Sequence, residues 1–167
     1  MHDELTEIDL KKMNEEIEFR TKVLRPKLIE EVKRTRAFGD LSENYEYKTA
    51  KQEKNRNESR IRYLTRMVSS AVIISSESEE GRIGLFDSVE LYFPEDDETQ
   101  TIRLVTTLRQ NALKGLISKE SPLGQALLGR RAGETVTVVV NDRYSYPVEI
   151  RAVAPGSDDD SLEISKY

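Results

Sequence analysis

The chain has 167 residues, of which 34% are charged and 37% are hydrophobic. That is few apolar residues for one compact globule, and it is typical of a chain with an exposed coiled-coil part. The absence of cysteine excludes a disulfide framework and a thiolate metal site. No apolar run approaches the roughly 20 residues that span a bilayer, and the first residues do not resemble a signal peptide. We therefore expect a cytoplasmic protein without a membrane partner.

The charge is unevenly distributed along the chain. The net charge is −5, but residues 1–75 hold 16 Lys/Arg against 14 Asp/Glu, whereas residues 76–167 hold 10 against 17. This asymmetry indicates two units with different electrostatic roles. We expect a helical hairpin over residues 1–75, a linker over 76–81 and a small domain over 82–167.

The first predicted element is a helix over about residues 7–37. Its apolar residues recur at spacings of three, four and seven, which gives one narrow stripe: Leu10, Met13, Ile17, Leu24, Leu28 and Val32. Pro26 lacks a backbone donor, so we expect a local bend there. Phe38 and Gly39 end the helix, because glycine readily adopts the left-handed conformation that follows many helices.

The second predicted element is a helix over about residues 41–72. Steps of three and four connect Tyr47, Ala50, Lys54, Asn57, Ile61, Leu64, Val68 and Ala71. This pattern is typical of a coiled-coil seam. Two such helices joined by Gly39 predict an antiparallel hairpin, a rod of roughly 45 Å at 1.5 Å per residue.

The remaining chain predicts a small domain of strands with one short helix. After the Ser/Glu-rich linker, β-forming residues predict strands over 84–93, 99–107, 135–140 and 144–153. Ser121 and Pro122 form a helix start, and Gly129 closes that helix. Residues 155–161 are expected to be a flexible acidic tail in solvent. The fold class is therefore α+β, with a coiled-coil hairpin followed by a small antiparallel β domain.

The turn between the two helices carries the first candidate site residues. Asp40 and Glu43 lie three residues apart, so they occupy neighbouring positions at the start of a helix. One interpretation is a capping box, in which both side chains bind free backbone donors. The other is a pair of carboxylates that bind Mg²⁺ together with a partner, since two carboxylates do not make a closed metal site.

A basic face lies behind this turn. On the second helix it comprises Lys48, Lys51, Lys54, Arg56, Arg60, Arg62 and Arg66, and the first helix adds Lys33, Arg34 and Arg36. Such a face is either ordinary solvated charge or a contact for a nucleic-acid backbone. We identify Tyr45 and Tyr47 as the only rings near the turn, with Tyr47 on the seam, and expect no aromatic platform for single-stranded nucleic acid.

The run from Gly39 to Tyr47, Gly-Asp-Leu-Ser-Glu-Asn-Tyr-Glu-Tyr, resembles the tip signature of the bacterial GreA/GreB transcript cleavage factors. The resemblance extends to residues 24–29 and 60–61 in the predicted helices. It resumes at residues 115–118, 121–124 and 127–129 in the second domain. The similarity thus covers nearly the full length in the order that the family shows.

The resemblance implies a fold and a function. The C-terminal domain would be similar to FK506-binding proteins, and the coiled coil would enter the secondary channel of bacterial RNA polymerase. Asp40 and Glu43 would help the polymerase to hold its second catalytic Mg²⁺, and the polymerase itself would cleave backtracked RNA. The protein would then be a monomeric cofactor of the polymerase, not an enzyme, without a cofactor of its own.

The resemblance also assigns contact residues. Arg36 and Lys51, with Lys48 beside them, would meet the extruded RNA 3′ segment. Ser121, Pro122, Leu123 and Gly124 would belong to the surface that grips the channel rim. Residues 106–111 depart from the family, because they are basic to neutral where many members are acidic.

Three other functions are compatible with parts of the pattern. A Gre-like channel inhibitor need not keep the Asp40 and Glu43 pair, so the intact pair favours cleavage. A freestanding nuclease would need a third converging ligand. A structural adaptor would use the acidic turn only as a helix cap.

Overall fold

The computed structural model describes residues 3–39, 44–77, 79–159 and 161–166. The chain divides into two units. The hairpin unit contains Leu10–Ala71, and the β unit combines Asp3–Asp9 with Val72–Tyr167. This division differs from the predicted boundaries, which placed residues 3–9 with the hairpin. Within the described ranges, no helix is both long and apolar enough to cross a membrane.

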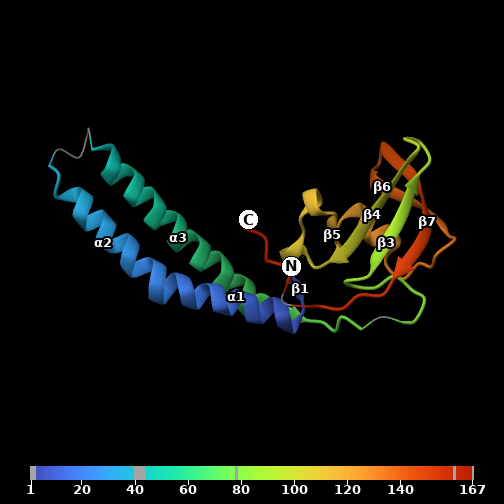
Figure 1. Ribbon diagram of the computed structural model, residues 1–167, viewed down its shortest axis with the longest axis horizontal. Coiled ribbons are helices and arrows are strands. Elements are labelled where there is room, and N and C mark those ends of the chain that lie inside the picture. Colours follow the sequence, from blue (N-terminus) through green and yellow to red (C-terminus); the bar gives the residue numbers. More distant parts are fainter. Residues whose placement is uncertain (1–2, 40–43, 78, 160, 167) are drawn as a thin grey trace. The chain divides into compact units, whose positions relative to one another are not determined.

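The hairpin unit consists of two helical arms, which confirms the predicted hairpin (Figure 1). The first arm runs through α1 (Glu7–Phe19), a π-helical segment η1 (Arg20–Leu24) and α2 (Arg25–Arg36). The second arm is α3 (Tyr45–Ser70), which lies beside α2. The predicted start of this helix at Leu41 is wrong, because α3 begins at Tyr45.

The π-helical segment is the local effect of Pro26. The backbone N–H of Arg25 bonds to the carbonyl of Arg20, five residues back, where an α-helix would use the fourth. A proline ring inside a helix crowds the carbonyl four residues earlier and offers that carbonyl no donor. Widening the turn before Pro26 relieves this conflict and keeps the arm helical.

The seam of the hairpin is thin in apolar side chains. Its buried members among the described residues are Met13, Thr35, Ala50, Asn57, Ile61, Leu64 and Met67. The predicted stripe named Val68, but Met67 is buried and Val68 is only half-buried. Two of the buried members are polar, so hydrogen bonds and ion pairs must contribute to the joining of the arms.

The β unit is built on a five-stranded sheet in the order β5-β4-β3-β7-β6. The strands are β3 (Ser88–Phe93), β4 (Glu98–Val105), β5 (Leu116–Ser118), β6 (Thr135–Asn141) and β7 (Tyr144–Ala154). The predicted antiparallel arrangement holds except at one edge, where β5 pairs parallel to β4. Helix α4 (Pro122–Leu127) confirms the predicted short helix. The likeness to FK506-binding proteins stays a prediction.

Three strands of the β unit were not predicted, namely β5 and the short pair β1 and β2. Strand β1 (Glu4–Leu5) pairs parallel with β2 (Val72–Ile73), with Glu4 opposite Val72. This pairing explains why residues 3–9 belong to the β unit. The core of the unit consists of buried aliphatic residues from the sheet and α4, with Ile83 from the segment before β3: Ile83, Val89, Leu91, Ile102, Leu104, Leu127, Val136, Val138, Val148 and Ile150.

The described residues 155–159 are mostly exposed, as predicted, but they are hydrogen-bonded to the β unit, so the prediction of a flexible tail is wrong. Asp158 accepts hydrogen bonds from Arg109 and Thr6. Leu162 packs against a second apolar cluster that contains Phe86 and Val105. These partners come from distant parts of the chain, which local composition does not reveal.

Candidate functional site: the hairpin tip

The hairpin tip is the part of the molecule where α2 ends and α3 begins. Asp40 and Glu43, the predicted metal-binding pair, lie outside the described residues. The described residues on either side are Gly39, in the left-handed region with φ of 104°, and Asn44. Asp40 directly follows Gly39 in the chain, and Glu43 directly precedes Asn44.

Asn44 clamps the two helices together at this tip. Its Oδ1 accepts a hydrogen bond of 3.0 Å from the backbone N–H of Tyr47, which caps α3. Its Nδ2 donates a bond of 2.6 Å to the carbonyl of Thr35 near the end of α2. The N-cap is therefore Asn44, and the predicted capping role of Asp40 for this helix is wrong. Neither Asp40 nor Glu43 is needed to begin α3.

The clamp has a second layer on the α2 side. Thr35 is 1% exposed, and its hydroxyl donates to the backbone carbonyl of Glu31 over 2.9 Å. Its own carbonyl also accepts from the backbone N–H of Phe38. The chain is thus held on both sides of residues 40–43.

The predicted basic residues lie on exposed helix surface near the tip. Arg36, Lys48 and Lys51 are all exposed. The Nζ of Lys48 lies 5.4 Å from the ring centroid of Tyr45. Arg34, also named in the basic face, is differently engaged: it donates two hydrogen bonds to Glu31, of 3.0 and 2.6 Å, and lies over the Phe38 ring. These bonds hold the pKa of Glu31 below its ordinary value.

Two aromatic side chains are exposed at the tip. Tyr45 is 77% exposed and Phe38 is 57% exposed. The sequence interpretation missed Phe38 as a surface ring, because Phe-Gly was interpreted only as a helix end. A hollow of about 320 Å³ adjoins Tyr45, lined by Glu31, Arg34, Tyr45, Glu46, Thr49, Ala50 and Glu53.

Further back along the hairpin, a polar network joins the arms. Glu16 accepts hydrogen bonds from Arg20 at 2.8 Å and from Arg60 at 3.1 and 3.2 Å. Arg20 also donates to the buried amide of Asn57, which in turn donates to the carbonyl of Arg20.

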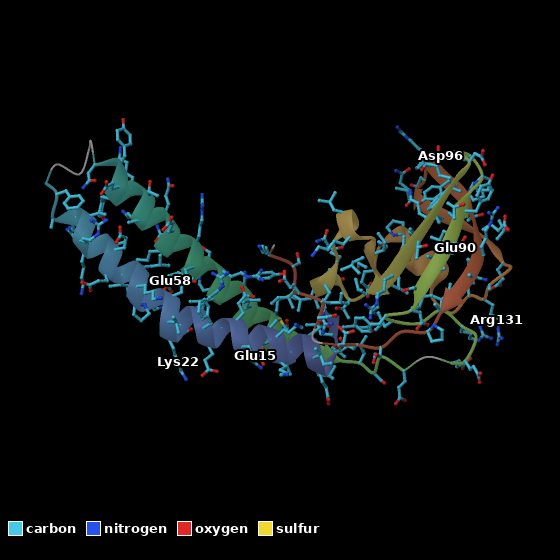
Figure 2. The ribbon with its side chains drawn as sticks, viewed as in Figure 1. Glu15, Lys22, Glu58, Glu90, Asp96 and Arg131 are labelled. Atoms are coloured by element: carbon cyan, nitrogen blue, oxygen red, sulfur yellow. The ribbon has the colours of Figure 1, made fainter. Side chains whose placement is uncertain are left out.

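Nearer the tip than this network, Arg25 and Glu58 form a bidentate pair of 2.7 and 2.9 Å across the arms. Figure 2 labels Glu58 on α3 and shows Lys22 pointing away from that helix. The Arg25–Glu58 pair helps to fix which residues of the two arms lie opposite each other. It thereby also fixes which ends of α2 and α3 meet at the tip.

The four residues predicted to grip the channel rim form the start of α4. The hydroxyl of Ser121 accepts from the backbone N–H of Gly124 over 3.0 Å and caps the helix. Gly124 is buried, and a Cβ there would lie 2.1 Å from the carbonyl oxygen of Ser118. Leu123 packs partly against the core, whereas Pro122 is exposed. Ser121 and Gly124 thus have structural roles, and Pro122 offers the surface.

In the parts of the chain that the structure describes, no group of three or more His, Asp or Glu side chains could hold a metal ion. The donor chemistry of Asp40 and Glu43 fits a hard cation, because Mg²⁺ is commonly bound through one or two carboxylates and otherwise through water or phosphate oxygens. A site completed by another molecule suits such a pair.

The chain is similar to known proteins over nearly its full length. The GreA/GreB family model described as "Transcription elongation factor, N-terminal" matches residues 4–73, and the model described as "Transcription elongation factor, GreA/GreB, C-term" matches residues 77–155.

Individual relatives agree with these matches. Transcription elongation factor GreA of Mesomycoplasma hyopneumoniae (strain 7448) is 39% identical over 144 residues, which cover 86% of this chain and 90% of the relative. GreA of Geobacillus kaustophilus is 39% identical over 135 residues, covering 80% and 85%. Among solved structures, the GreA factor homolog 1 (Gfh1) of Thermus thermophilus is 27% identical and covers 93% of this chain and 100% of its own, with a TM-score of 0.44.

Proposed function

The chain belongs to the GreA/GreB family of transcription elongation factors, and from this membership we propose that it acts inside bacterial RNA polymerase. The hairpin enters the secondary channel of the polymerase. There it stimulates the polymerase to cleave the RNA of backtracked complexes. The factor contributes side chains to a reaction that the polymerase active site performs.

The observation that carries this proposal is the clamped tip. The hydrogen bond from Asn44 to Thr35 joins the two arms directly at the turn. Asn44 is the residue after Glu43, and Thr35 lies five residues before Asp40. Because Asn44 already caps α3, that helix does not require a cap from Asp40, and we assign the carboxylates of Asp40 and Glu43 to an ion shared with the polymerase.

The role of the carboxylates follows from their number. Two carboxylates bind a hard cation weakly alone, but they complete a site that already has ligands from elsewhere. Mg²⁺ in a two-metal site stabilises the attacking and leaving oxygens of phosphodiester hydrolysis. Asp40 and Glu43 would bind and orient the second ion of the polymerase. This division of labour fits a chain whose described residues contain no cluster of three or more potential metal ligands.

The exposed cations would meet the RNA. Arg36, Lys48 and Lys51 lie close along the chain to the turn and are exposed. Positive side chains at such positions attract the phosphates of the extruded 3′ segment. The exposed Pro122 would contact the channel rim, while Ser121 and Gly124 hold the start of α4 that presents it.

The proposal is tested with backtracked transcription complexes. Asp40→Asn and Glu43→Gln keep the shape of each side chain and remove its charge. Each should slow Mg²⁺-dependent RNA shortening by at least about tenfold, the smallest loss typical of groups that support a metal site. Binding to polymerase, measured by competition with the unmodified chain, should not change.

The matched control is Asp142→Asn, which removes an exposed carboxylate from the β6–β7 turn. This variant should shorten RNA at the original rate. Full activity of the Asp40→Asn/Glu43→Gln double variant would overturn the metal-delivery assignment. Cleavage of naked RNA by the purified chain would overturn the division of labour with the polymerase.

A further inference from the structure

We propose that Tyr45 is a stacking platform for one base of single-stranded RNA, and that the hollow beside it receives the amino edge of that base. This inference rests on the proposed function, because it places the base in the RNA that the tip meets. It assigns a binding role to Tyr45, which lies outside the carboxylate pair and outside the basic face, and it revises the expectation that the tip carries no aromatic platform.

The first argument is the exposure of the ring. Tyr45 is 77% exposed, whereas Tyr47, two residues on, is half-buried against the seam. Folding of the hairpin therefore gains little from the Tyr45 ring. Every nucleobase has a π-face, and stacking on an exposed aromatic ring is the main sequence-tolerant contact of proteins with single strands.

The second argument is the rigidity of the position. Tyr45 is the first residue of α3, directly after the Asn44 cap. The bonds of Asn44 to Tyr47 and Thr35 fix the backbone that carries the ring. A platform on a fixed backbone loses less conformational entropy on binding than one on a free loop.

The third argument is the chemistry of the hollow. Its volume of about 320 Å³ is bounded by Tyr45 on α3 and by Glu31 and Arg34 on α2. Arg34 is already paired with Glu31, so its charge is largely compensated. Glu46 and Glu53 add two more carboxylates to the lining. A phosphate would be repelled here.

Carboxylates accept hydrogen bonds from amino groups on base edges, as Glu and Asp do from cytosine N4. Adenine and cytosine carry such amino groups, and uracil does not. The hollow therefore suits the amino edge of a base. The Nζ of Lys48 lies over the Tyr45 ring, 5.4 Å from its centroid, so a base stacked on this ring would bring its phosphate near that cation. Base and backbone would be met by groups of opposite charge.

The inference is tested with the full chain in the absence of polymerase. The chain contains no tryptophan, so Tyr45→Trp introduces a single fluorescent reporter that keeps an aromatic face. Adding a short oligoadenylate should quench the emission of this variant in a saturable way. A short oligouridylate of equal length should quench it more weakly.

The matched control is Tyr144→Trp, at a tyrosine of β7 that is 54% exposed. Its emission should not respond to either oligonucleotide. In competition against the Tyr45→Trp signal, Tyr45→Ala should bind oligoadenylate at least about fivefold more weakly than the unmodified chain, the lower limit for loss of one stacked base.

Three results would overturn the inference: an unresponsive Tyr45→Trp, an equal response of Tyr144→Trp, or Tyr45→Ala competing as well as the unmodified chain. Equal quenching by both oligonucleotides would overturn the role of the hollow. None of these binding measurements depends on RNA cleavage. They would therefore still test the role of Tyr45 if the metal-delivery proposal failed. Conversely, normal cleavage with an unresponsive Tyr45→Trp would reject the platform alone.

Discussion

Two charge networks, built from the same kinds of side chain, lie in the two units and differ in burial. In the hairpin unit, Glu16, Arg20 and Arg60 keep side-chain exposures of 21%, 27% and 10%. In the β unit, Arg109 donates 2.7 and 2.5 Å hydrogen bonds to Asp9 and Asp158, with exposures of 0%, 0% and 6%. The hairpin pairs stay in contact with water, whereas the β-unit pairs are sealed from it.

The sealed network shows what burial of charge requires. Thr6 and Asp9 cap each other's backbone, which gives the carboxylate of Asp9 a second donor. The Arg109 guanidinium also lies 5.4 Å from the Phe86 ring centroid. A buried charge that loses its partner cannot recover hydration, so the same type of substitution should cost more in the β unit than in the hairpin unit.

The largest effect is expected from Arg109→Met. This change leaves Asp9 and Asp158 buried without their cation, which should lower the stability of the β unit by about 3–5 kcal/mol. Hydrogen–deuterium exchange of peptides from β3 and β7 measures the loss.

Arg151→Met is the control for this change, because Arg151 lies on exposed surface of the same unit. It should leave that exchange nearly unchanged. Equal losses in the two variants would show that burial does not set the strength of the β-unit network.

Glu16→Gln should have the next largest effect. It removes the carboxylate that accepts from Arg20 and Arg60 but leaves these cations partly hydrated, so the hairpin should lose about 1–3 kcal/mol. Thermal unfolding followed by helical circular dichroism measures this loss.

The neighbouring Glu15 is the matched control, since its side chain is 63% exposed and lies on the same helix (Figure 2). Glu15→Gln should unfold as the unmodified chain does. If Glu16→Gln unfolds at the same temperature as Glu15→Gln, the polar network around Glu16 does not stabilise the hairpin.

Acid should weaken the hairpin through the same residue. Burial raises the pKa of Glu16, but hydrogen bonds from Arg60 and Arg20 outweigh it, so the pKa lies below its ordinary value. A lowered pKa stabilises the folded state above the unfolded value of about 4.3, and this stabilisation is lost as the pH falls through the folded value.

The melting temperature of the hairpin should therefore fall more steeply below about pH 4.3 in the unmodified chain than in Glu16→Gln. Parallel curves for the two proteins, measured by circular dichroism across that range, would contradict the assignment to Glu16.

The smallest effect is expected from Glu18→Gln. Glu18 and Lys22 form a pair of 2.9 Å, but their side chains are 64% and 70% exposed. Exposed pairs contribute little because water and salt screen them. The melting temperature should not change measurably. If it falls as much as in Glu16→Gln, solvent exposure does not explain why some ion pairs stabilise the chain more than others.

Local patterns predicted the elements that depend on periodicity. Leu64 and Ile61 mark the seam by spacing, and Ser121 marks the start of α4 by its capping preference. The start of α3 was misplaced because Asp40, Ser42 and Asn44 are all good N-cap residues. N-cap propensity alone does not decide among these three residues. The hydrogen bond from Asn44 to Thr35, between the two arms, favours Asn44 as the cap.

Contacts between residues that are far apart in the chain could not be predicted from the sequence. In the sequence, residues 106–111 are basic to neutral where many family members are acidic, and residues 155–161 were interpreted as a solvated acidic tail. The structure explains both through one contact, between Arg109 and Asp158, which lie 49 residues apart. The tail is held by the buried ion pair between Asp158 and Arg109, which amino-acid composition does not predict. For Asp40 and Glu43, the predicted metal role stays a prediction.

The central claim is that the tip carboxylates raise the occupancy of a metal ion in the polymerase. The most direct measurement is the Mg²⁺ dependence of cleavage in backtracked complexes, with the unmodified chain and with Asp40→Asn/Glu43→Gln. The account predicts that the unmodified chain lowers the Mg²⁺ concentration for half-maximal cleavage and that the double variant does not. An equal shift by both proteins would contradict it.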